Sequence, residues 1–374
     1  MENLVLYRKY RPQSFADIAG QEHVTVTIAN EIKSGHVAHA YLFSGPRGCG
    51  KTTTARIIAK AVNCLNRKTD AAEPCNECAN CVEIQSGRAI DLIEIDAASH
   101  RGIDDIRELR EGIKFAPTKL KFKVFIIDEC HQLSKDAANA LLKTLEEPPA
   151  HAIFILATTE LHKILPTILS RCQRFDFHKL PLPQLVGRLQ KLADLEQVKV
   201  EKAALELVAL SAGGSVRDAE SLLGQVLVFA GNAGKKNLVK AADIRQVLGM
   251  TENKAVGDLA ALISQKNTAG AINYLNEIAE NGYDVQEYAK NIVGYLRQGL
   301  ILSIFGAETA KNDNTMIAGL TDEEFEKLRA LAMALGMSNI KRIVEIFLSA
   351  QDKIRYSPIP QLPLELAIVE SCVI

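Results

Sequence analysis

The chain has 374 residues, of which 47% are hydrophobic and 24% charged, and its formal net charge is -1. That length accommodates two or three domains that each bury a core, and the near-zero charge excludes a strong global field for nucleic acid. The N-terminus lacks the charged-then-apolar order of a signal peptide, and no run approaches the roughly 18 apolar residues of a membrane span. We therefore expect a cytoplasmic protein with no membrane partner.

Residues 1–178 alternate short apolar runs with helical patterns, which is typical of an α/β domain in which helices wrap a parallel sheet. A proline-containing interruption at 179–183 marks the end of this domain. A small helical domain over 179–249 and an all-helical domain over 250–374 are predicted to follow. The predicted strands are residues 40–44, 91–96, 123–128, 152–158 and 172–177.

The first predicted strand is followed by GPRGCGKT, which fits the phosphate-binding pattern G-x-x-x-x-G-K-[ST] at every fixed position. Its glycines let backbone N–H groups converge on phosphate oxygens, while Lys51 neutralises the β- and γ-phosphates and Thr52 holds Mg²⁺. A helical pattern comes next, so the phosphates would lie at a helix N-terminus. A glycine-rich turn with an incidental lysine is the alternative. The residues expected to bind nucleotide in this segment are Gly45, Pro46, Arg47, Gly48, Cys49, Gly50, Lys51, Thr52 and Thr53.

Four of the eight cysteines lie within residues 64–81, in a polar segment with no evident core of its own. C-x₂-C-x₂-C places three thiolates on a tight loop, and a fourth from the preceding helix completes a tetrahedral zinc site that leaves no open position for catalysis. An iron–sulfur cluster or inert thiols are the alternatives. The expected zinc ligands are Cys64, Cys75, Cys78 and Cys81. The other four are expected to pack as small apolar side chains: Cys49, Cys130, Cys172 and Cys372.

A polar and basic loop, residues 97–103, precedes the next helical stretch. Ser99, the helix N-terminus and Arg101 are suited to a nucleic-acid phosphate backbone. A solvated loop is the alternative reading of the same composition.

The apolar run KVFIID ends in two carboxylates, Asp128 and Glu129. A strand end of this kind brings Asp128 to the edge of the sheet where phosphates bind, so that it holds Mg²⁺ directly or through water. Glu129 is then placed to act as base or to orient a water on the γ-phosphate. Solvated acids at a strand end are the alternative.

Two arginines are candidates for contact with the γ-phosphate, where a positive charge stabilises phosphoryl transfer. Arg171 follows a short helical pattern, and Arg217 stands at the predicted start of a helix after Gly213-Gly214. Structural ion pairs are the alternative for both.

These motifs, in this order, resemble the AAA+ ATPases and, within them, clamp-loader subunits of the bacterial DNA polymerase III gamma/tau type. The resemblance extends over residues 1–220 and rests on the phosphate loop, the cysteine cluster and several further motifs. Those motifs are YRKYRP from Tyr7, EIDAAS from Glu94, IDE from Ile127, NALLKTLEEPP from Asn139, ATT from Ala157 and SRC from Ser170. Beyond residue 220 it rests on position and helical content.

The resemblance implies roles for the matching positions. Arg171 would reach the ATP of an adjacent subunit, Arg217 would touch the phosphates from a lid over 179–249, and Thr159, rather than Thr158, would be the polar sensor near the γ-phosphate. The residues near adenine and ribose would be Tyr7, Arg8, Arg11 and Pro12. The zinc ligands of the family correspond to the four clustered cysteines. The start of the family's DNA-tracking helix corresponds to Ser99, His100 and Arg101.

The resemblance also implies a function. The chain would be an ATP hydrolase with no polymerase chemistry of its own, using Lys51, Glu129, Thr159 and, in trans, Arg171. It would open a sliding clamp and load it onto primer–template DNA, in a hetero-pentamer with delta-type and delta-prime-type subunits held by a collar over 250–374. The alternatives are a ring motor of the branch-migration type and a non-catalytic structural subunit of the loader.

Overall fold

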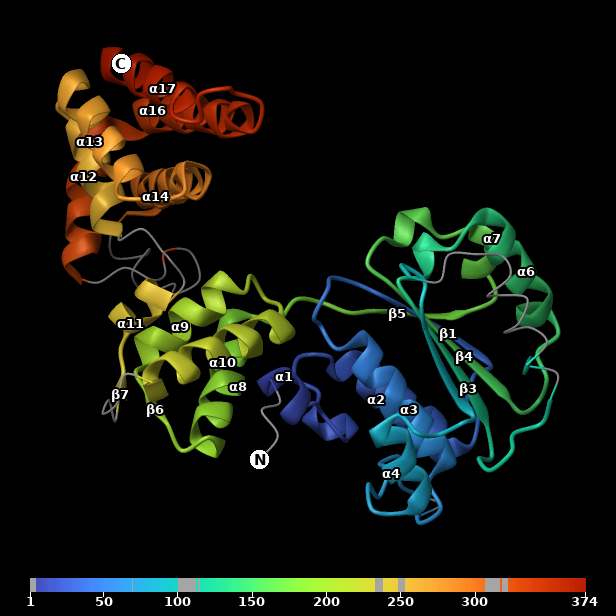
Figure 1. Ribbon diagram of the computed structural model, residues 1–374. Coiled ribbons are helices and arrows are strands. Elements are labelled where there is room, and N and C mark those ends of the chain that lie inside the picture. The colour runs from blue at the N-terminus through green and yellow to red at the C-terminus, as the bar shows by residue number, and fades with distance from the viewer. Residues whose placement is uncertain are drawn as a thin grey trace. The chain divides into compact units, whose positions relative to one another are not determined.

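The computed structural model describes residues 5–68, 70–99, 112–113, 115–232, 238–247, 253–306, 317 and 322–374. Its backbone forms two compact units (Figure 1). The first contains the chain up to Gln197 together with Ser211–Gly224, and the second contains Val198–Leu210 and Gln225–Ile374. The expected division at residues 178 and 249 stays a prediction.

A five-stranded sheet lies at the centre of the first unit (Figure 1), and its spatial order is β2-β3-β4-β1-β5. Every pairing in it is parallel. Ser44 lies opposite both Thr158 and Asp176, and Asp96 lies opposite Asp128, so the carboxyl ends of the strands form one polar edge. The strands are β1 (Ala40–Ser44), β2 (Leu92–Asp96), β3 (Lys123–Asp128), β4 (Ala152–Thr158) and β5 (Gln173–Asp176).

The central strands are continuous apolar runs because helices cover both faces of the sheet. β1 and β4 are buried along their whole lengths. Tyr41 and Phe43 belong to a core cluster with Ile28 and Ile57, on the face of α2 and α3. Ala40 and Leu42, which alternate with Tyr41 and Phe43 along β1, point to the other face, where α6 (Lys135–Glu146) and α7 (Pro166–Leu169) lie (Figure 1).

The helices of the first unit begin and end where local chemistry requires. Gly35 and Gly87 close two of them with left-handed backbones, at φ 75° and 71°. Ser134 accepts a hydrogen bond from Ala137 N–H and so begins another. The helices are α1 (Leu6–Lys9), α2 (Glu22–Ser34), α3 (Lys51–Asn63), α4 (Ala79–Ser86), α6 (Lys135–Glu146), α7 (Pro166–Leu169), α8 (Leu182–Leu195) and the first half of α10 (Val216–Asn232), with short 3₁₀ turns η1 (Phe15–Asp17), η2 (Cys130–Gln132) and η3 (Leu161–Lys163).

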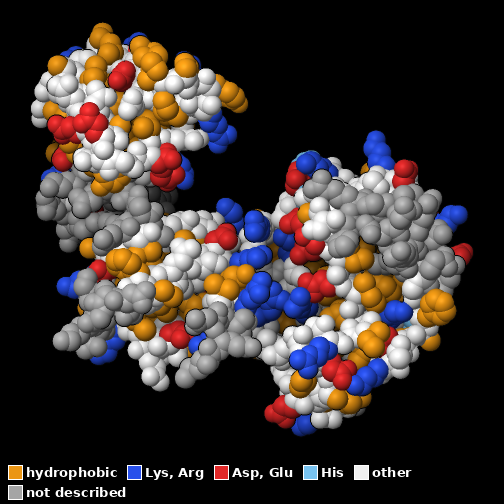
Figure 2. All heavy atoms as spheres, in the orientation of Figure 1, with side chains coloured by type: hydrophobic (Ala, Val, Ile, Leu, Met, Phe, Trp, Pro, Cys, Tyr) orange, Lys and Arg blue, Asp and Glu red, His pale blue; other side chains and the backbone are white. Residues whose placement is uncertain are grey.

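The described residues of the second unit are helical apart from one pair of two-residue strands. Its main core joins α12, α13, α14, α16 and α17 around Leu275, Tyr288 and Phe347. Apolar side chains also lie on the surface of this bundle (Figure 2), and Val373 is 80% exposed. The elements are β6 (Lys199–Val200), α9 (Lys202–Ser211), the rest of α10, β7 (Leu238–Val239), α11 (Ala241–Val247), α12 (Asn253–Ser264), α13 (Thr268–Glu280), α14 (Val285–Phe305), α16 (Asp322–Ile354, interrupted at Gly336) and α17 (Leu362–Val373).

The expected fold class is confirmed: a parallel α/β sheet followed by helical segments. Three predicted strands have the observed bounds, while β2 begins one residue later and β5 is shorter at both ends. Cys172 N–H donates to Leu169 O and completes the turn after α7, which is why β5 starts only at the next residue. Among the described residues we find no helix with the length and hydropathy of a membrane span.

Candidate nucleotide site and cysteine cluster

The loop between β1 and α3 is shaped by three glycines with left-handed backbones. Their φ angles are 143° at Gly45, 78° at Gly48 and 101° at Gly50. A Cβ at Gly45 would lie 2.2 Å from Phe177 O, and one at Gly48 would lie 2.1 Å from Ser215 Oγ. Neither position has room for a side chain, so the loop keeps its curvature only with glycine.

Lys51, the first residue of α3, is buried beneath this loop. Its Nζ donates to Gly45 O at 2.7 Å and to Pro46 O at 2.9 Å. Burial lowers the pKa of Lys51, and the nearby Glu129 and Asp128 carboxylates oppose that effect. An ammonium group held by two carbonyl oxygens of a glycine-rich loop is suited to contact a phosphate that the loop binds.

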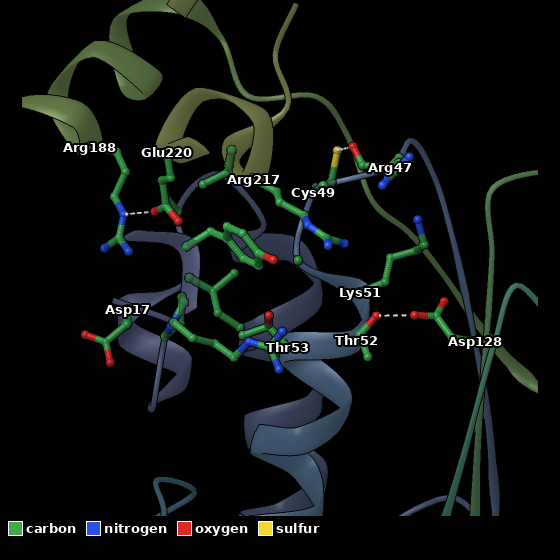
Figure 3. Close-up of a pocket in the computed structure, with 18 of the residues that line it drawn as sticks. Asp17, Arg47, Cys49, Lys51, Thr52, Thr53, Asp128, Arg188, Arg217 and Glu220 are labelled. Atoms are coloured by element: carbon green, nitrogen blue, oxygen red, sulfur yellow. Dashed lines mark hydrogen bonds and ion pairs between the residues drawn. The ribbon is translucent and has the colours of Figure 1, made fainter. Parts of the chain in front are cut away.

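Thr52 and Asp128 meet across the polar edge of the sheet (Figure 3). Thr52 Oγ1 donates to Asp128 Oδ2 at 2.6 Å, although the two residues are 76 positions apart in the chain. A hydroxyl and a carboxylate are oxygen ligands, the kind that Mg²⁺ takes from a protein when phosphates supply the others. The donor set therefore fits this ion.

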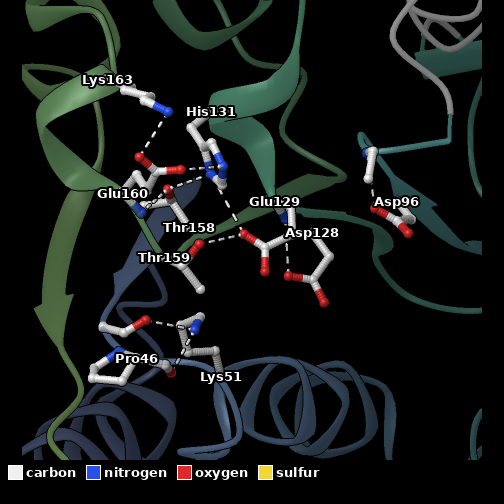
Figure 4. A network of polar contacts seen from close by, with 12 residues as sticks. Pro46, Lys51, Asp96, Asp128, Glu129, His131, Thr158, Thr159, Glu160 and Lys163 are labelled. Atoms are coloured by element: carbon white, nitrogen blue, oxygen red, sulfur yellow. Dashed lines mark hydrogen bonds and ion pairs between the residues drawn. The ribbon is translucent and has the colours of Figure 1, made fainter. Parts of the chain in front are cut away.

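Glu129 lies at the centre of a polar network (Figure 4). Its backbone is left-handed, at φ 48°, and its Oε2 accepts a hydrogen bond from Thr159 Oγ1 at 2.9 Å. The same oxygen lies 3.4 Å from His131 Nδ1. The structure thus brings together two residues expected at the γ-phosphate, Glu129 and Thr159.

His131 was not among the residues expected at the site. Its side chain is 5% exposed, and Nδ1 lies 3.0 Å from Thr158 Oγ1. Nε2 lies 3.3 Å from Glu160 Oε1, and Glu160 is paired with Lys163 at 2.7 Å (Figure 4). A single histidine after a strand end carries no spacing signal, because its partners come from the end of a different strand.

The N-terminal segment and the start of α10 complete the pocket (Figure 3). Tyr7, Arg11, Pro12 and Arg217 line it, together with the loop residues from Arg47 to Thr53, whereas Gly45 and Pro46 do not. The Arg217 guanidinium lies 4.8 Å from the centroid of the Tyr7 ring, and Arg217 and Arg8 lower the pKa of that phenol. Arg8 is exposed and is not a lining residue, although its guanidinium lies 5.8 Å from the same centroid.

Several lining residues have no motif that would have predicted them: Asp17, Ile18, Ala19, Arg188, Val216 and Glu220. Arg188 Nε donates to Glu220 Oε1 at 2.9 Å, and Arg188 Nη2 donates to Tyr10 O at 2.8 Å. Burial raises the pKa of Glu220, and Arg188 opposes it. These contacts join α8, α10 and the N-terminal segment, which meet only in the folded chain.

Arg171 lies apart from this pocket, in the turn after α7. Its Nη2 donates to Glu146 Oε1 at 2.5 Å, and its Nη1 donates to Thr167 O at 2.7 Å. It lines a separate open depression with His39, Glu146 and Gln173. Within this chain Arg171 makes an ion pair, as the alternative reading expected, and it faces no phosphate loop of its own subunit.

The four clustered cysteines converge in space. The sulfur atoms of Cys64, Cys75, Cys78 and Cys81 all lie within 4.8 Å of one another. Cys75 N–H donates to Cys64 Sγ and Cys78 N–H donates to Cys75 Sγ, each at 3.3 Å, which stabilises thiolate charge. Four converging thiols in this geometry fit a tetrahedral zinc ion.

Of the residues expected at DNA, the structure describes only one. Ser99 is exposed and its N–H donates to Asp96 O at 3.0 Å. His100 and Arg101 lie outside the described residues. Of the other cysteines, Cys49, Cys130 and Cys372 are buried as expected, and Cys172 is partly exposed.

Three family models match successive parts of the chain. Residues 20–181 match "DNA polymerase III, delta subunit", residues 184–232 match "DNA polymerase III clamp loader subunit, ATPase lid domain", and residues 239–374 match "DNA polymerase III subunits gamma and tau domain III".

Curated relatives match along the whole chain. DNA polymerase III subunit tau of Bacillus subtilis is 43% identical over 373 residues, which are 100% of this chain and 64% of the relative. Subunit tau of Escherichia coli is 37% identical over 99% of this chain and 55% of its own length. Subunit gamma of Buchnera aphidicola is 33% identical over 99% of this chain and 98% of its own length. The chain therefore spans 55 to 64% of the two tau relatives, which is less than two thirds, and nearly all of the gamma relative, and it belongs to the gamma/tau family of DNA polymerase III subunits.

Proposed function

We propose that this chain is an ATPase subunit of a replicative clamp loader. The observation that carries the proposal is the convergence of Lys51, Thr52, Asp128, Glu129 and Arg217 on one pocket, in a chain of the gamma/tau family. A structural subunit without catalysis would not need this set of residues. A role in replication would also put the protein in the cytoplasm.

ATP binding would use the phosphate loop and the N-terminal segment. The loop amides and Lys51 would hold the β- and γ-phosphates, with the residues from Gly45 to Thr53 around them. Tyr7, Arg11 and Pro12 would face the adenine and ribose, with Arg8 at the rim. Thr52 and Asp128 would hold Mg²⁺, which supplies positive charge to the phosphate oxygens.

Hydrolysis would depend on Glu129. A water attacks the γ-phosphorus, the bond to the β–γ bridging oxygen breaks, and ADP and phosphate form. Glu129 would take the proton of the attacking water, and Thr159 would hold the carboxylate in place through the 2.9 Å hydrogen bond. Arg217 would stabilise the phosphates within the subunit.

Arg171 would act on the ATP of a neighbouring subunit. It lines a different depression from Lys51, and its side chain is 31% exposed, so it is accessible to a second chain. An arginine supplied in trans makes hydrolysis depend on assembly. The partners would be further copies of this chain and delta-type and delta-prime-type subunits, joined through a collar over 250–374, with a lid over 179–249.

The loader would act on a sliding clamp and on primer–template DNA. Contacts to DNA would be mainly to phosphates, with Ser99 and, beyond the described residues, His100 and Arg101 as candidates, and binding would weaken with salt. The cysteine cluster would hold zinc as a structural ion, because four thiolates leave no position open for substrate.

The test is ATP-dependent retention of a labelled sliding clamp on primed circular DNA, with this chain reconstituted with the other loader subunits of its organism. Retention that needs ATP and is lost in Lys51→Ala is the expected result. If the protein instead hydrolyses ATP on branched DNA and moves that DNA without retaining a clamp, the proposal is wrong and the chain is a ring motor. Metal analysis of the purified chain should give one zinc ion per chain, and none after Cys78→Ser.

A further inference from the structure

The N-terminal segment forms one wall of the nucleotide pocket, but not all of its residues line the pocket. Arg11 and Pro12 line the pocket, and so do Asp17, Ile18 and Ala19. The residues between these stretches, 13–16, do not line the pocket and are held by contacts with other segments. The position of this wall therefore depends on what residues 13–16 contact.

The first contact is the carboxylate of Glu73, two positions before Cys75. Glu73 Oε2 accepts a hydrogen bond from Phe15 N–H at 2.8 Å, and Glu73 Oε1 accepts one from Ala16 N–H at 3.0 Å. These are the first two N–H groups of η1, which have no partner inside the turn. A side chain 57 to 58 positions away thus caps the turn that carries Asp17.

The second contact passes through Lys60, which is 2% exposed. Its Nζ donates to Gln13 O at 2.9 Å, to Gln13 Oε1 at 2.7 Å and to Asn76 Oδ1 at 2.6 Å. Asn76 lies between Cys75 and Cys78 and has a left-handed backbone, at φ 60°. Lys60 therefore ties the turn between two of the thiols directly to residue 13.

Apolar packing joins the same two segments. Ala72 and Phe15 are 3% and 4% exposed and belong to one core cluster, which also contains Ile18 of the pocket wall. The cysteine segment is thus linked to residues 13–16 by the carboxylate of Glu73 and, through the ammonium group of Lys60 in α3, by Asn76. Its Ala72 is buried in the same core cluster as Phe15.

We propose that the cysteine loop is the support of the nucleotide pocket, with Glu73 as the positioning residue for its N-terminal wall. The inference rests on the proposed nucleotide and zinc sites. With zinc bound by Cys64, Cys75, Cys78 and Cys81, the loop from Cys64 to Cys81 would be closed and the positions of Glu73 and Asn76 would be fixed. Glu73 and, through Lys60, Asn76 would then hold residues 13–16 so that the flanking residues meet the ligand. If the wall is correctly placed in only a fraction of the molecules, the apparent affinity for the nucleotide is the full affinity multiplied by that fraction.

Glu73→Gln tests the inference in the full chain. The amide keeps the shape of the carboxylate but faces one of the two N–H groups with its own NH₂, so one hydrogen bond becomes a donor–donor contact. Glu77→Gln is the matched control, because Glu77 is exposed and lies in the same loop. The binding of a fluorescent ATP analogue should weaken about tenfold in Glu73→Gln and stay unchanged in the control, with equal zinc content in both proteins.

Amide hydrogen exchange supplies a readout that is independent of nucleotide. In Glu73→Gln, and in the wild-type chain after zinc is removed with a chelator, the Phe15 and Ala16 amides should exchange at least about tenfold faster, while those of β1 keep their protection. Wild-type affinity in Glu73→Gln, or unchanged exchange at these two amides after zinc removal, would overturn the inference. A wild-type chain that binds no ATP analogue would instead refute the proposed function, and the exchange measurement would still decide the role of Glu73.

Discussion

Arg171 and Glu146 form an ion pair, with 2.5 Å between Nη2 and Oε1, that connects the turn after α7 to the last residue of α6. Arg171 Nη1 also donates to Thr167 O, so the guanidinium is held on two sides. A group fixed in this way at a partly exposed position is oriented before any second chain arrives. That orientation favours a role in trans over free movement into its own pocket.

Arg171→Ala should silence hydrolysis in the assembled loader. An arginine that reaches the transferring phosphoryl group from a neighbour is worth about 10³-fold or more in rate, so the kcat of the reconstituted complex should fall by that order. The ATP affinity of the isolated chain should not change, because Arg171 does not line its pocket. Measured turnover by a variant complex at the wild-type rate would rule out the role in trans.

Glu146→Gln should have a smaller effect on the same turnover. The pair is half exposed, and such pairs are worth up to about 1 kcal/mol, which corresponds to about a fivefold fall in kcat when the orientation of Arg171 is lost. Glu147→Gln is the control, since its side chain is the exposed next neighbour. Equal rates for the two variants would mean that the ion pair does not orient Arg171.

The parts of the site that lie within short stretches of the chain could be predicted from the sequence. The glycines of the phosphate loop, the carboxylates at the end of β3 and the cysteine spacing each lie within a short stretch. The structure places the loop and the carboxylates at the carboxyl edge of the parallel sheet, and it brings the four cysteines together between α3 and α4. The apolar runs likewise predicted three strands to the residue, because strands covered on both faces are continuously apolar.

Contacts between distant segments were not predictable from patterns. Nothing near Glu73 signals that it caps η1, and nothing near Arg188 signals Glu220, because each pair meets only after the chain has folded. The same reason explains why His131 was not predicted to lie at the site. Its partners Thr158 and Glu160 come from β4 and the turn after it, and no spacing rule relates one strand end to the next.

Glu129→Gln should separate ATP binding from hydrolysis. The amide keeps a hydrogen-bond partner for Thr159 but cannot accept the proton of water, and loss of a general base costs about 10² to 10⁴ in rate. Single-turnover hydrolysis in the reconstituted complex should fall by this factor while ATP affinity changes less than about twofold. A parallel loss of affinity would place Glu129 in binding rather than in catalysis.

The environment of Asp91 determines how the stability of the first unit should change at acid pH. It is 1% exposed, and its carboxylate accepts hydrogen bonds from the N–H groups of Thr118, Lys119 and Leu120 at 2.8 to 2.9 Å. Burial alone raises the pKa of Asp91, but these three bonds lower it by more, so the pKa lies below the ordinary 3.8. The stability that this group contributes is therefore complete above about pH 4 and is lost as the pH falls from 3.8 through the lowered value.

Asp91→Asn should destabilise the folded chain by about 2 kcal/mol at neutral pH, because the three N–H groups lose a charged acceptor. The difference between wild type and variant in the free energy of unfolding, measured by urea titration, should shrink below pH 3.8. A difference that is constant down to pH 3 would show that the carboxylate charge contributes nothing.

His131→Ala should slow hydrolysis by removing a group that lies against the carboxylate of Glu129. Nδ1 lies 3.4 Å from the Glu129 carboxylate and 3.0 Å from Thr158 Oγ1. Without the ring, Thr159 is the hydrogen-bond partner left to that carboxylate among the residues that the structure describes. A catalytic group that shifts by a fraction of an ångström loses about tenfold to a hundredfold in rate, and single-turnover hydrolysis should fall within that range at unchanged ATP affinity. His131→Asn keeps a polar atom near the position of Nδ1 and should recover part of the rate.

A double-mutant cycle distinguishes positioning from a general loss of structure. If His131 acts through Glu129, then His131→Ala should have no further effect on the residual rate of Glu129→Gln, because the group that it positions is already inactive. Additive losses would mean that His131 supports the fold or contacts the nucleotide by another route. Thermal unfolding of each variant provides the control, since a histidine that acts only by position leaves the melting temperature near that of the wild type, whereas one that supports the core lowers it.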